Sequence, residues 1–362
     1  MRGDARANDA HASLARFKAR VVPKLTTATT HKGSHGGKIA VVGGSELYAG
    51  APYFASAAAM RAGCDLCHVF THAKCAPVVK GYAADLVVHA AWTRDADGTK
   101  TKTKTRRRDD EMTTEIDLVD AFRRFRIDSA VIGPGLANGA ALETVEALRD
   151  VASACVVDAD GLKALEPTNV GEDGEEAPRT RNPRALATPN KMELWRLVRK
   201  ASGAFEGGVK TMDLNAREDR EKIANALRRY VGYNFLVKGE EDYLFMQHWD
   251  VVPTVCDSER AANGVASIVR LGFDGVGSPK RSGGQGDVLA GVLAVFLLWA
   301  SRADGKTITD SVDDYVAAVA AACFLVKAAS SAAYAEHGRG AHAEDVLARV
   351  APTFMTHLEP EL

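Results

Sequence analysis

Short apolar runs alternate with helical stretches along most of this chain, and no other feature constrains its fold as strongly. Apolar runs of this length, bounded by turn residues, are typical of buried strands. Strands are expected at 38–44, 64–70, 85–90, 129–136, 154–161, 185–189 and 234–239, and helices at 51–62, 140–151, 191–199 and 213–231. Repeated strand–helix units predict an α/β fold with a mostly parallel sheet covered by helices on both faces.

The chain shows no internal repeat and no domain break, so one domain is expected. Residues 242–246 and 250–256 are expected to form an antiparallel pair, and three helical stretches should follow residue 287. Two segments are expected to be surface insertions. One lies near 92–115 and contains the charged stretch TKTKTKTRRRDDE, and the other, near 166–184, is rich in Gly, Glu and Pro.

The first 25 residues are rich in Arg and Ala, which is compatible with a transit peptide or with a helical arm. Asp4 and Asp9 count against the transit peptide, because such peptides contain few acidic residues. A helical arm over residues 1–30 is therefore expected. We expect a cytoplasmic protein, with a mitochondrial or plastid location as the alternative.

The charge balance restricts the kinds of partner. The formal net charge is −1, which argues against a nucleic acid or a membrane surface as the main partner. With 46% hydrophobic and 26% charged residues, the chain has enough apolar material for a large core. No apolar run is expected to be long enough to span a membrane.

A glycine-rich segment, SGGQGD, precedes a long apolar run from Val288 to Ala300. The apolar residues recur at helical spacing and surround the helix, which predicts a central position in the core. The free N–H groups at the start of such a helix can bind phosphate. The segment lacks the Gly-Lys-Ser/Thr ending of a Walker A loop and the G-x-G-x-x-G pattern of a dinucleotide loop. Asp287, which ends it, is either a plain helix N-cap or a general base beside the phosphate.

Polar motifs follow five of the expected strands: GGS at 43–45, GPG at 133–135, DADG at 158–161, TPNKMELWR at 188–196 and KGEED at 238–242. Ligands of parallel α/β sheets bind at the carboxyl ends of the strands. Each motif alone is weak evidence, since Gly and Asp are common in turns. Together they predict one crevice that is lined by all five motifs and by the glycine-rich segment.

The segments HKGSHGGKIAVVGGSELYAGAP, VIGPGL, TPNKMELWR, VKGEED and GGQGDVLAG occur in this order. In this order they closely resemble the NAD(P)H-hydrate dehydratases, a branch of the ribokinase-like superfamily. The resemblance implies a three-layer α/β/α sandwich over residues 31–357. Residues 258–275 look like a third insertion in comparison with the family.

The resemblance also implies the residues of the site. Asp287 would face the reacting centre as the catalytic residue. The hydrated dinucleotide would be bound by Gly135, Asn190, Lys191, Met192, Glu193, Leu194, Trp195, Arg196 and Asp287. ATP would be bound by Lys238, Gly239, Glu240, Glu241, Asp242, Gly277, Ser278, Pro279, Lys280, Arg281, Ser282, Gly283, Gly284, Gln285 and Gly286. Mg²⁺ is the implied cofactor, and its ligands are not identified.

The implied activity is nicotinamide nucleotide repair. The enzyme would dehydrate the S-form of hydrated NADH and NADPH (NADHX and NADPHX), using ATP and releasing ADP and phosphate. Water has a pKa of about 15.7, so hydroxide leaves the hydrate poorly. A phosphate monoester has a second pKa of about 6, and phosphorylating the hydroxyl therefore creates a good leaving group.

The SGGQGD segment resembles the eukaryotic branch of the family, which uses ATP. Lys280 and Arg281 lie just before this segment. Their charges could offset the negative charge of the triphosphate, or both side chains could be solvated surface charges. The fused epimerase domain of many bacterial members is missing from this sequence. A functional partnership with a separate NAD(P)H-hydrate epimerase is therefore expected, and a homo-oligomer is possible.

Alternatives remain for several residues and for the function. Lys238 either supports the nucleotide phosphates or is a solvated charge. Glu193 either holds a metal-bound water or complements the helix dipole, and Asp158 is either a site residue or a turn former. The rival functions are a ribokinase-like kinase for a thiazole alcohol or vitamin precursor, and a nucleotide-binding regulatory protein without catalysis. Fold likeness alone cannot separate these functions.

Overall fold

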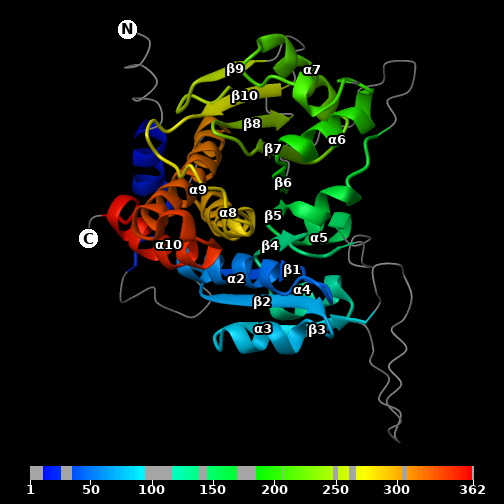
Figure 1. Ribbon diagram of the computed structural model, residues 1–362, viewed down its shortest axis with the longest axis vertical. Coiled ribbons are helices and arrows are strands. Elements are labelled where there is room, and N and C mark those ends of the chain that lie inside the picture. Colours follow the sequence, from blue (N-terminus) through cyan, green and yellow to red (C-terminus); the bar gives the residue numbers. More distant parts are fainter. Residues whose placement is uncertain are drawn as a thin grey trace, which may run out of the picture.

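A single sheet runs through the whole molecule (Figure 1). The computed structural model describes residues 11–25, 35–93, 116–137, 145–168, 185–205, 207–247, 252–260, 266–303 and 308–360. In these residues the sheet has ten strands in the order β3-β2-β1-β4-β5-β6-β7-β8-β10-β9. The strands are β1 (Lys38–Val42), β2 (Leu66–His72), β3 (Val87–Trp92), β4 (Ser129–Ile132), β5 (Ala154–Val157), β6 (Ala185–Ala187), β7 (Tyr233–Val237), β8 (Asp242–Gln247), β9 (Ser258–Arg260) and β10 (Ala266–Leu271).

The parallel part of the sheet reverses its order beside β1. The chain passes from β1 to β2 and β3 on one side and then returns to β4 on the other side. Val42, the last residue of β1, pairs with Phe70 of β2 and with Ile132 of β4, so the carboxyl ends of these strands lie together. The expected mostly parallel α/β fold is confirmed, since all pairings among β1 to β7 are parallel. Strand β7 pairs with β8 in the antiparallel direction.

Alternating side chains of β1 enter two separate hydrophobic cores. Ile39 and Val41 belong to one core, and Ala40 and Val42 belong to the other. The first core is covered by α2 (Gly50–Ala62), α3 (Ala76–Tyr82), α8 (Gln285–Arg302), α9 (Ile308–His337) and α10 (Ala343–His357). The second is covered by α4 (Leu118–Phe125), α5 (Val145–Val151), α6 (Lys191–Ser202) and α7 (Arg217–Leu227). Figure 1 shows α8, α9 and α10 on one side of the sheet and α5 and α6 on the other.

Helix α8 occupies the centre of the first core, as its apolar pattern predicts. Every residue from Val288 to Trp299 is buried. Gly291 allows close approach to α2, because a Cβ there would lie 2.0 Å from the Ala55 carbonyl oxygen. Close packing of α8 against α2 holds the glycine-rich segment over the ends of the strands.

Two helices have the length and composition that a membrane span requires, so the expectation that no apolar run is long enough is wrong. They are Gln285–Arg302 and Asp310–Gly340, and in each helix 72% of the most apolar stretch is buried inside the fold. A buried core helix of a folded protein meets the same two criteria. Length and composition are therefore weak evidence for a membrane here.

The expected pairing of residues 242–246 with 250–256 is wrong. Strand β8 pairs with β10, where Leu244 lies opposite Val269, and β9 forms the outer edge. Residues 266–271 are thus part of the sheet and not of a surface insertion, because both faces of β10 carry buried apolar side chains such as Ile268 and Val269. Residues 94–115 and 169–184, in the other two expected insertions, lie outside the described residues.

The beginning of the chain is helical where it is described, over residues 11–21, including a π-helical turn at Phe17–Val21. This helix is part of the core. Phe17 is fully buried against Phe296 of α8, with 4.4 Å between ring centroids. The Arg16 Nε donates to the Oδ1 of Asp314 on α9 at 2.7 Å. The N-terminal helix therefore packs against α8 and is hydrogen-bonded to α9.

Candidate active site

The polar motifs expected at the strand ends are joined to one another by backbone hydrogen bonds. The Gly44 N–H donates to the Pro134 carbonyl oxygen at 2.8 Å, and the Lys238 N–H donates to the Pro189 carbonyl oxygen at 3.0 Å. Asn190 and Lys238 also form an isolated parallel bridge beyond β6 and β7. The five motifs therefore follow neighbouring strands and lie next to one another along the carboxyl edge of the sheet.

The glycine-rich segment turns directly into α8. Gly284 is the N-cap residue with φ 92°, and a Cβ there would lie 2.9 Å from the Ala343 Cβ and 3.0 Å from the Phe54 Cδ2. Only glycine accepts both this φ and this space. No side chain caps α8. The Gln285 N–H donates to the Ser282 carbonyl oxygen at 3.3 Å, so the next N–H groups, of Gly286 and Asp287, are the ones that can bind an anion.

Lys238 and Asp158 form a buried ion pair beneath this segment. The Lys238 Nζ lies 2.6 Å from the Asp158 Oδ1, and Asp158 is 2% exposed. A Cβ on Gly286 would lie 3.5 Å from that Nζ, so the ion pair directly adjoins the start of α8. Burial lowers the pKa of Lys238, but Asp158, Glu193 and Asp287 raise it by more, and the net pKa is raised. Lys238 is therefore charged, and the Asp158 carboxylate is its partner.

Asp287 lies in the first turn of α8 and is not its N-cap, because Gly284 occupies that position. Burial raises the pKa of Asp287 to about 8, with a further increase from Asp158 and an opposing decrease from Lys238. A carboxylate with a pKa in this range is a stronger base than an ordinary carboxylate, and it can accept a proton in the fraction of molecules in which it is ionised. These properties favour the general-base interpretation of Asp287 over the N-cap.

Asn190 and Glu193 shape the start of α6. The Asn190 Oδ1 accepts hydrogen bonds from the Met192 and Glu193 N–H groups, and the Glu193 Oε2 accepts one from the Asn190 N–H at 2.8 Å. This capping box fixes the Glu193 carboxylate near Lys238. Burial raises the pKa of Glu193, and the Asn190 N–H and Lys238 partly oppose that increase. Glu193 thus has a structural role in the capping box of α6.

A cavity of about 260 Å³ opens between the β7–β8 turn, α8 and α9, and we call it the nucleotide cavity. Its lining includes eight of the predicted site residues: Asn190, Lys238, Gly239, Asp242, Arg281, Ser282, Gln285 and Gly286. The remaining lining residues, Leu289, Cys323, Val326 and Lys327, come from α8 and α9. The structure thus brings together residues from both predicted ATP-binding segments.

Lys327 is a site residue that the sequence analysis missed. Its Nζ lies 2.9 Å from the Asp242 Oδ2 and donates to the Glu240 carbonyl oxygen at 2.8 Å. The side chain therefore ties α9 to the β7–β8 turn. No local motif marks Lys327, since it stands in a run of Ala, Cys, Leu and Val that reads as core. Only the packing of α9 against this turn reveals it.

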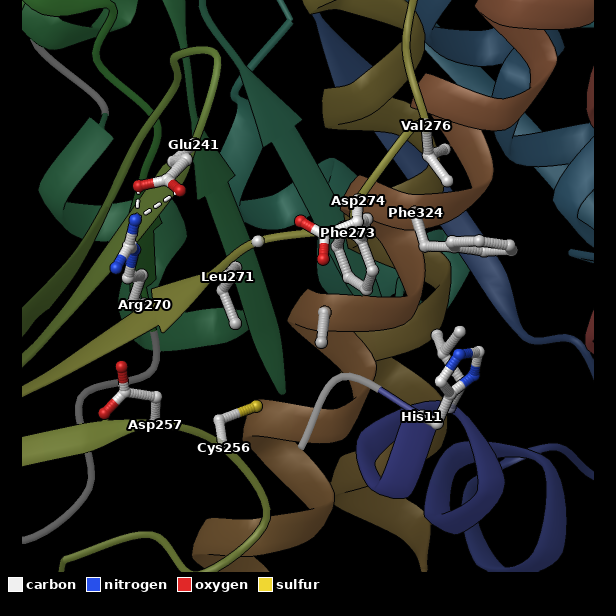
Figure 2. Close-up of a pocket in the computed structure, with 13 residues that line it drawn as sticks. His11, Glu241, Cys256, Asp257, Arg270, Leu271, Phe273, Asp274, Val276 and Phe324 are labelled. Atoms are coloured by element: carbon white, nitrogen blue, oxygen red, sulfur yellow. Dashed lines mark hydrogen bonds and ion pairs between the residues drawn. The ribbon is translucent and has the colours of Figure 1, made fainter. Parts of the chain in front are cut away.

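Some predicted ATP-binding residues point elsewhere. The Glu241 carboxylate pairs with the Arg270 guanidinium on β10. Figure 2 shows this pair beside a second cavity, of about 130 Å³, with apolar walls that include Phe273, Val276 and Phe324. The Lys280 ammonium donates to the Arg339 carbonyl oxygen. Of the two cations before the glycine-rich segment, Arg281 lines the nucleotide cavity.

A hollow of about 310 Å³ lies on the other side of the α6 start, and we call it the α6 hollow. Its lining consists of Ala159, Asp160, Leu162, Lys163, Glu193, Arg196, Leu197 and Lys200. Of the predicted substrate-binding residues, Glu193 and Arg196 lie here.

The other predicted residues of α6 have different surroundings. Leu194 is fully buried in the second core. The Trp195 Nε1 donates to the Phe205 carbonyl oxygen at 3.0 Å. Lys191 and Met192 are exposed at the start of the helix. Gly135, the remaining predicted residue, lies beside Tyr48, since a Cβ on it would be 2.8 Å from the Tyr48 Cβ.

Solved structures share this architecture. An ADP/ATP-dependent NAD(P)H-hydrate dehydratase from Bacillus subtilis, co-crystallised with ATP and Mg²⁺, superposes with a TM-score of 0.56 at 19% identity, over 94% of this chain and 97% of that one. A ribokinase-like superfamily protein from Enterococcus faecalis gives a TM-score of 0.59 at 15% identity, over 96% and 95% of the two chains. At these identities the likeness supports the ribokinase-like fold that the motifs implied.

Sequence comparisons identify the family. The family model described as NAD(P)H-hydrate dehydratase matches residues 39–266 and 273–352. ATP-dependent (S)-NAD(P)H-hydrate dehydratases from Ciona intestinalis and Bos taurus are 31% and 32% identical to this chain, covering 96% and 94% of it and 82% and 88% of their own lengths. The enzyme of the same name from Arabidopsis thaliana is 32% identical over 88% of this chain and 78% of its own length. This chain belongs to the NAD(P)H-hydrate dehydratase family.

Proposed function

We propose that this protein uses ATP to dehydrate the S-form of NADHX and NADPHX, giving NADH or NADPH together with ADP and phosphate. The observation that carries this proposal is the position of Asp287. It lies in the first turn of α8, within the electrostatic influence of the Lys238–Asp158 pair, at the end of the family's glycine-rich segment. A carboxyl group beside a phosphate site is unfavourable unless it accepts a proton.

ATP would occupy the nucleotide cavity, with its phosphates at the start of α8. The N–H groups after Gly284 and the positive end of the helix dipole favour the phosphates. Lys238, Arg281 and Lys327 add cationic charge to the walls of the cavity. These charges would stabilise the negative charge that develops during phosphoryl transfer.

Asp287 would take the proton from the hydroxyl of the hydrate as its oxygen attacks the γ-phosphorus. The new O–P bond forms as the bond to the β-phosphate oxygen breaks, and ADP leaves. The lone pair on the ring nitrogen then expels phosphate by breaking the C–O bond. Loss of a proton from the adjacent ring carbon restores the double bond of the dihydronicotinamide.

The carboxylates near Lys238 are compatible with Mg²⁺. This ion usually keeps several waters and binds through one or two carboxylates together with substrate phosphates. Among the described residues no group of three or more metal-ligating side chains occurs, but Asp158 and Glu193 both face Lys238. These two residues would hold the ion, which supplies positive charge against the phosphates when bound.

The proposal also assigns the epimer. An enzyme that accepts only the S-form requires a separate epimerase to supply that form from the R-form. A mixture of epimers should therefore be consumed to completion only when an NAD(P)H-hydrate epimerase is added. Complete consumption by this protein alone would contradict that assignment.

The direct test is an assay with purified protein, NADHX, ATP and Mg²⁺. Absorbance of the reduced nicotinamide should return, and each NADH formed should be accompanied by one ADP and one phosphate. Replacing ATP with ADP should slow the reaction. A stable phosphorylated product without formation of NADH would favour a ribokinase-like kinase instead.

A further inference from the structure

Two large side chains are left uncovered where the chain leaves β1 for α2. Leu47 is 84% exposed and Tyr48 is 56% exposed. The backbone around them is well held, since the Ser45 N–H donates to the Tyr48 carbonyl oxygen at 3.2 Å and the Lys74 Nζ lies 2.8 Å from the Glu46 Oε2. The fold thus fixes this turn and presents an apolar side chain and an aromatic ring to its surroundings.

This turn lies at the point where the strand order reverses. The β1–α2 turn and the GPG turn after β4 stand side by side, and open α/β sheets bind ligands at this place. Gly135 adjoins Tyr48 so closely that a Cβ on it would lie 2.8 Å from the Tyr48 Cβ. One turn into α2, Phe54 adjoins Gly284 of the glycine-rich segment. Through Tyr48 and Phe54, the β1–α2 segment therefore adjoins both the GPG turn and the glycine-rich segment that precedes Asp287.

Contacts link the GPG turn beside Tyr48 to the α6 hollow. Beyond Gly135, the Ala137 N–H donates to the Asp160 Oδ2 at 2.9 Å. Asp160 in turn lines the α6 hollow together with Glu193 and Arg196. A chain of contacts thus runs from Tyr48 along the ends of β4 and β5 to the start of α6. A dinucleotide is an extended ligand with a ring at each end, so it would contact several of these strand ends at once.

We propose that Tyr48 is a substrate-binding residue whose ring packs against a heterocyclic ring of the hydrated dinucleotide, with Leu47 beside it. This inference rests on the proposed function. A tyrosine ring offers a large contact area at low entropic cost. The pair is exposed beside the point where the strand order reverses, which is where open α/β sheets bind their ligands. Neither side chain is needed for folding, so both can be replaced without loss of the core.

The test is the kinetics of Tyr48→Ala, Tyr48→Phe and the control Tyr82→Ala. Tyr82 is a tyrosine of similar exposure, 51%, which lies on α3 and whose ring packs against that of Tyr53 on α2. Tyr48→Ala should raise the KM for NADHX on the order of tenfold, as expected for loss of one ring contact. The KM for ATP should not change. Tyr48→Phe keeps the ring and should behave like the unmodified protein, and so should Tyr82→Ala.

Binding of NADPH, the product, provides a second readout that does not need turnover. Its Kd should weaken in Tyr48→Ala and not in Tyr82→Ala. Hydrated nicotinamide mononucleotide, which has no adenine, shows which ring of the dinucleotide contacts Tyr48. If Tyr48→Ala raises the KM for this substrate too, Tyr48 packs against the reacting ring. If the KM for this substrate is unchanged, Tyr48 packs against adenine. If the unmodified protein dehydrates NADHX and Tyr48→Ala has an unchanged KM and Kd, the inference about Tyr48 is wrong. An inactive unmodified protein would instead contradict the proposed function.

Discussion

The Lys238 ammonium lies 2.6 Å from the buried Asp158 carboxylate, and this pair lies directly beneath the start of α8. The two residues come from the ends of β7 and β5, which are separated by β6. Their contact therefore depends on the whole parallel sheet. It also controls the electrostatics of Asp287, whose pKa is increased by Asp158 and decreased by Lys238.

Lys238→Met should weaken both folding and nucleotide binding. Removing the cation leaves Asp158 buried without its partner, and breaking a buried ion pair costs about 3–5 kcal/mol. Urea denaturation should show that loss in the free energy of unfolding, and the KM for ATP should rise. Lys74→Met is the control, because the Lys74–Glu46 pair has a similar distance of 2.8 Å but is exposed. Equal losses in the two variants would contradict this account.

Activity should depend on pH through Asp287. Burial raises the pKa of this group to about 8, and a general base acts only when it has lost its proton. The kcat/KM for NADHX should therefore rise with pH to a plateau above about pH 8. Asp158→Asn removes a like charge and should move the rise to lower pH, whereas Lys238→Met should move it to higher pH. A profile that is flat from pH 6 to pH 9 would exclude Asp287 as the titrating base.

Adjacent glycines of the phosphate segment should respond differently to alanine. Gly284 has φ 92° and no room for a Cβ, so Gly284→Ala should cost at least about 1 kcal/mol of stability and raise the KM for ATP. A Cβ on Gly283 would meet no atom within 4 Å, so Gly283→Ala is the matched control for stability. Thermal unfolding of both variants tests the difference. Similar midpoints would mean that the turn at Gly284 is not as constrained as the structure shows.

The N-terminal helix should contribute strongly to stability. Phe17→Ala empties a fully buried site beside Phe296, and such truncations cost about 3–5 kcal/mol. Leu25→Ala, at a residue that is 59% exposed, should change little. Chemical denaturation of the two variants provides the comparison. An unchanged free energy of unfolding in Phe17→Ala would show that residues 11–21 are only an appended arm.

The parallel half of the fold could be predicted from the sequence because each of its strands is a short apolar run that ends in a polar turn. KIAVV and NFLV are runs of this kind, and they form β1 and most of β7. The antiparallel edge could not be predicted in the same way. Residues 250–256 look as strand-like as 266–271, but only the latter pair with β8. Antiparallel partners are chosen by tertiary packing, which a local pattern does not contain.

The candidate site was predictable wherever a motif marks a strand end. Asn190, Lys238 and Gly286 do meet in the nucleotide cavity. The directions of individual side chains were not predictable. Glu241 and Lys280 belong to the expected ATP-binding segments, but Glu241 pairs with Arg270 and Lys280 donates to the Arg339 carbonyl oxygen. Lys327 could not be identified either, since its role arises from the way α9 crosses the β7–β8 turn.

The most direct test of the account is the turnover of Asp287→Asn compared with its affinity for ATP. Asparagine keeps the size of the side chain but cannot accept the proton, so kcat for NADHX should fall on the order of a hundredfold or more. The Kd for ATP should remain near that of the unmodified protein. Asp274→Asn, at an exposed carboxylate before the same glycine-rich segment, should have normal values of both. Near-normal turnover in Asp287→Asn, or a loss of activity matched by an equal loss of ATP binding, would contradict the central claim that Asp287 is the general base.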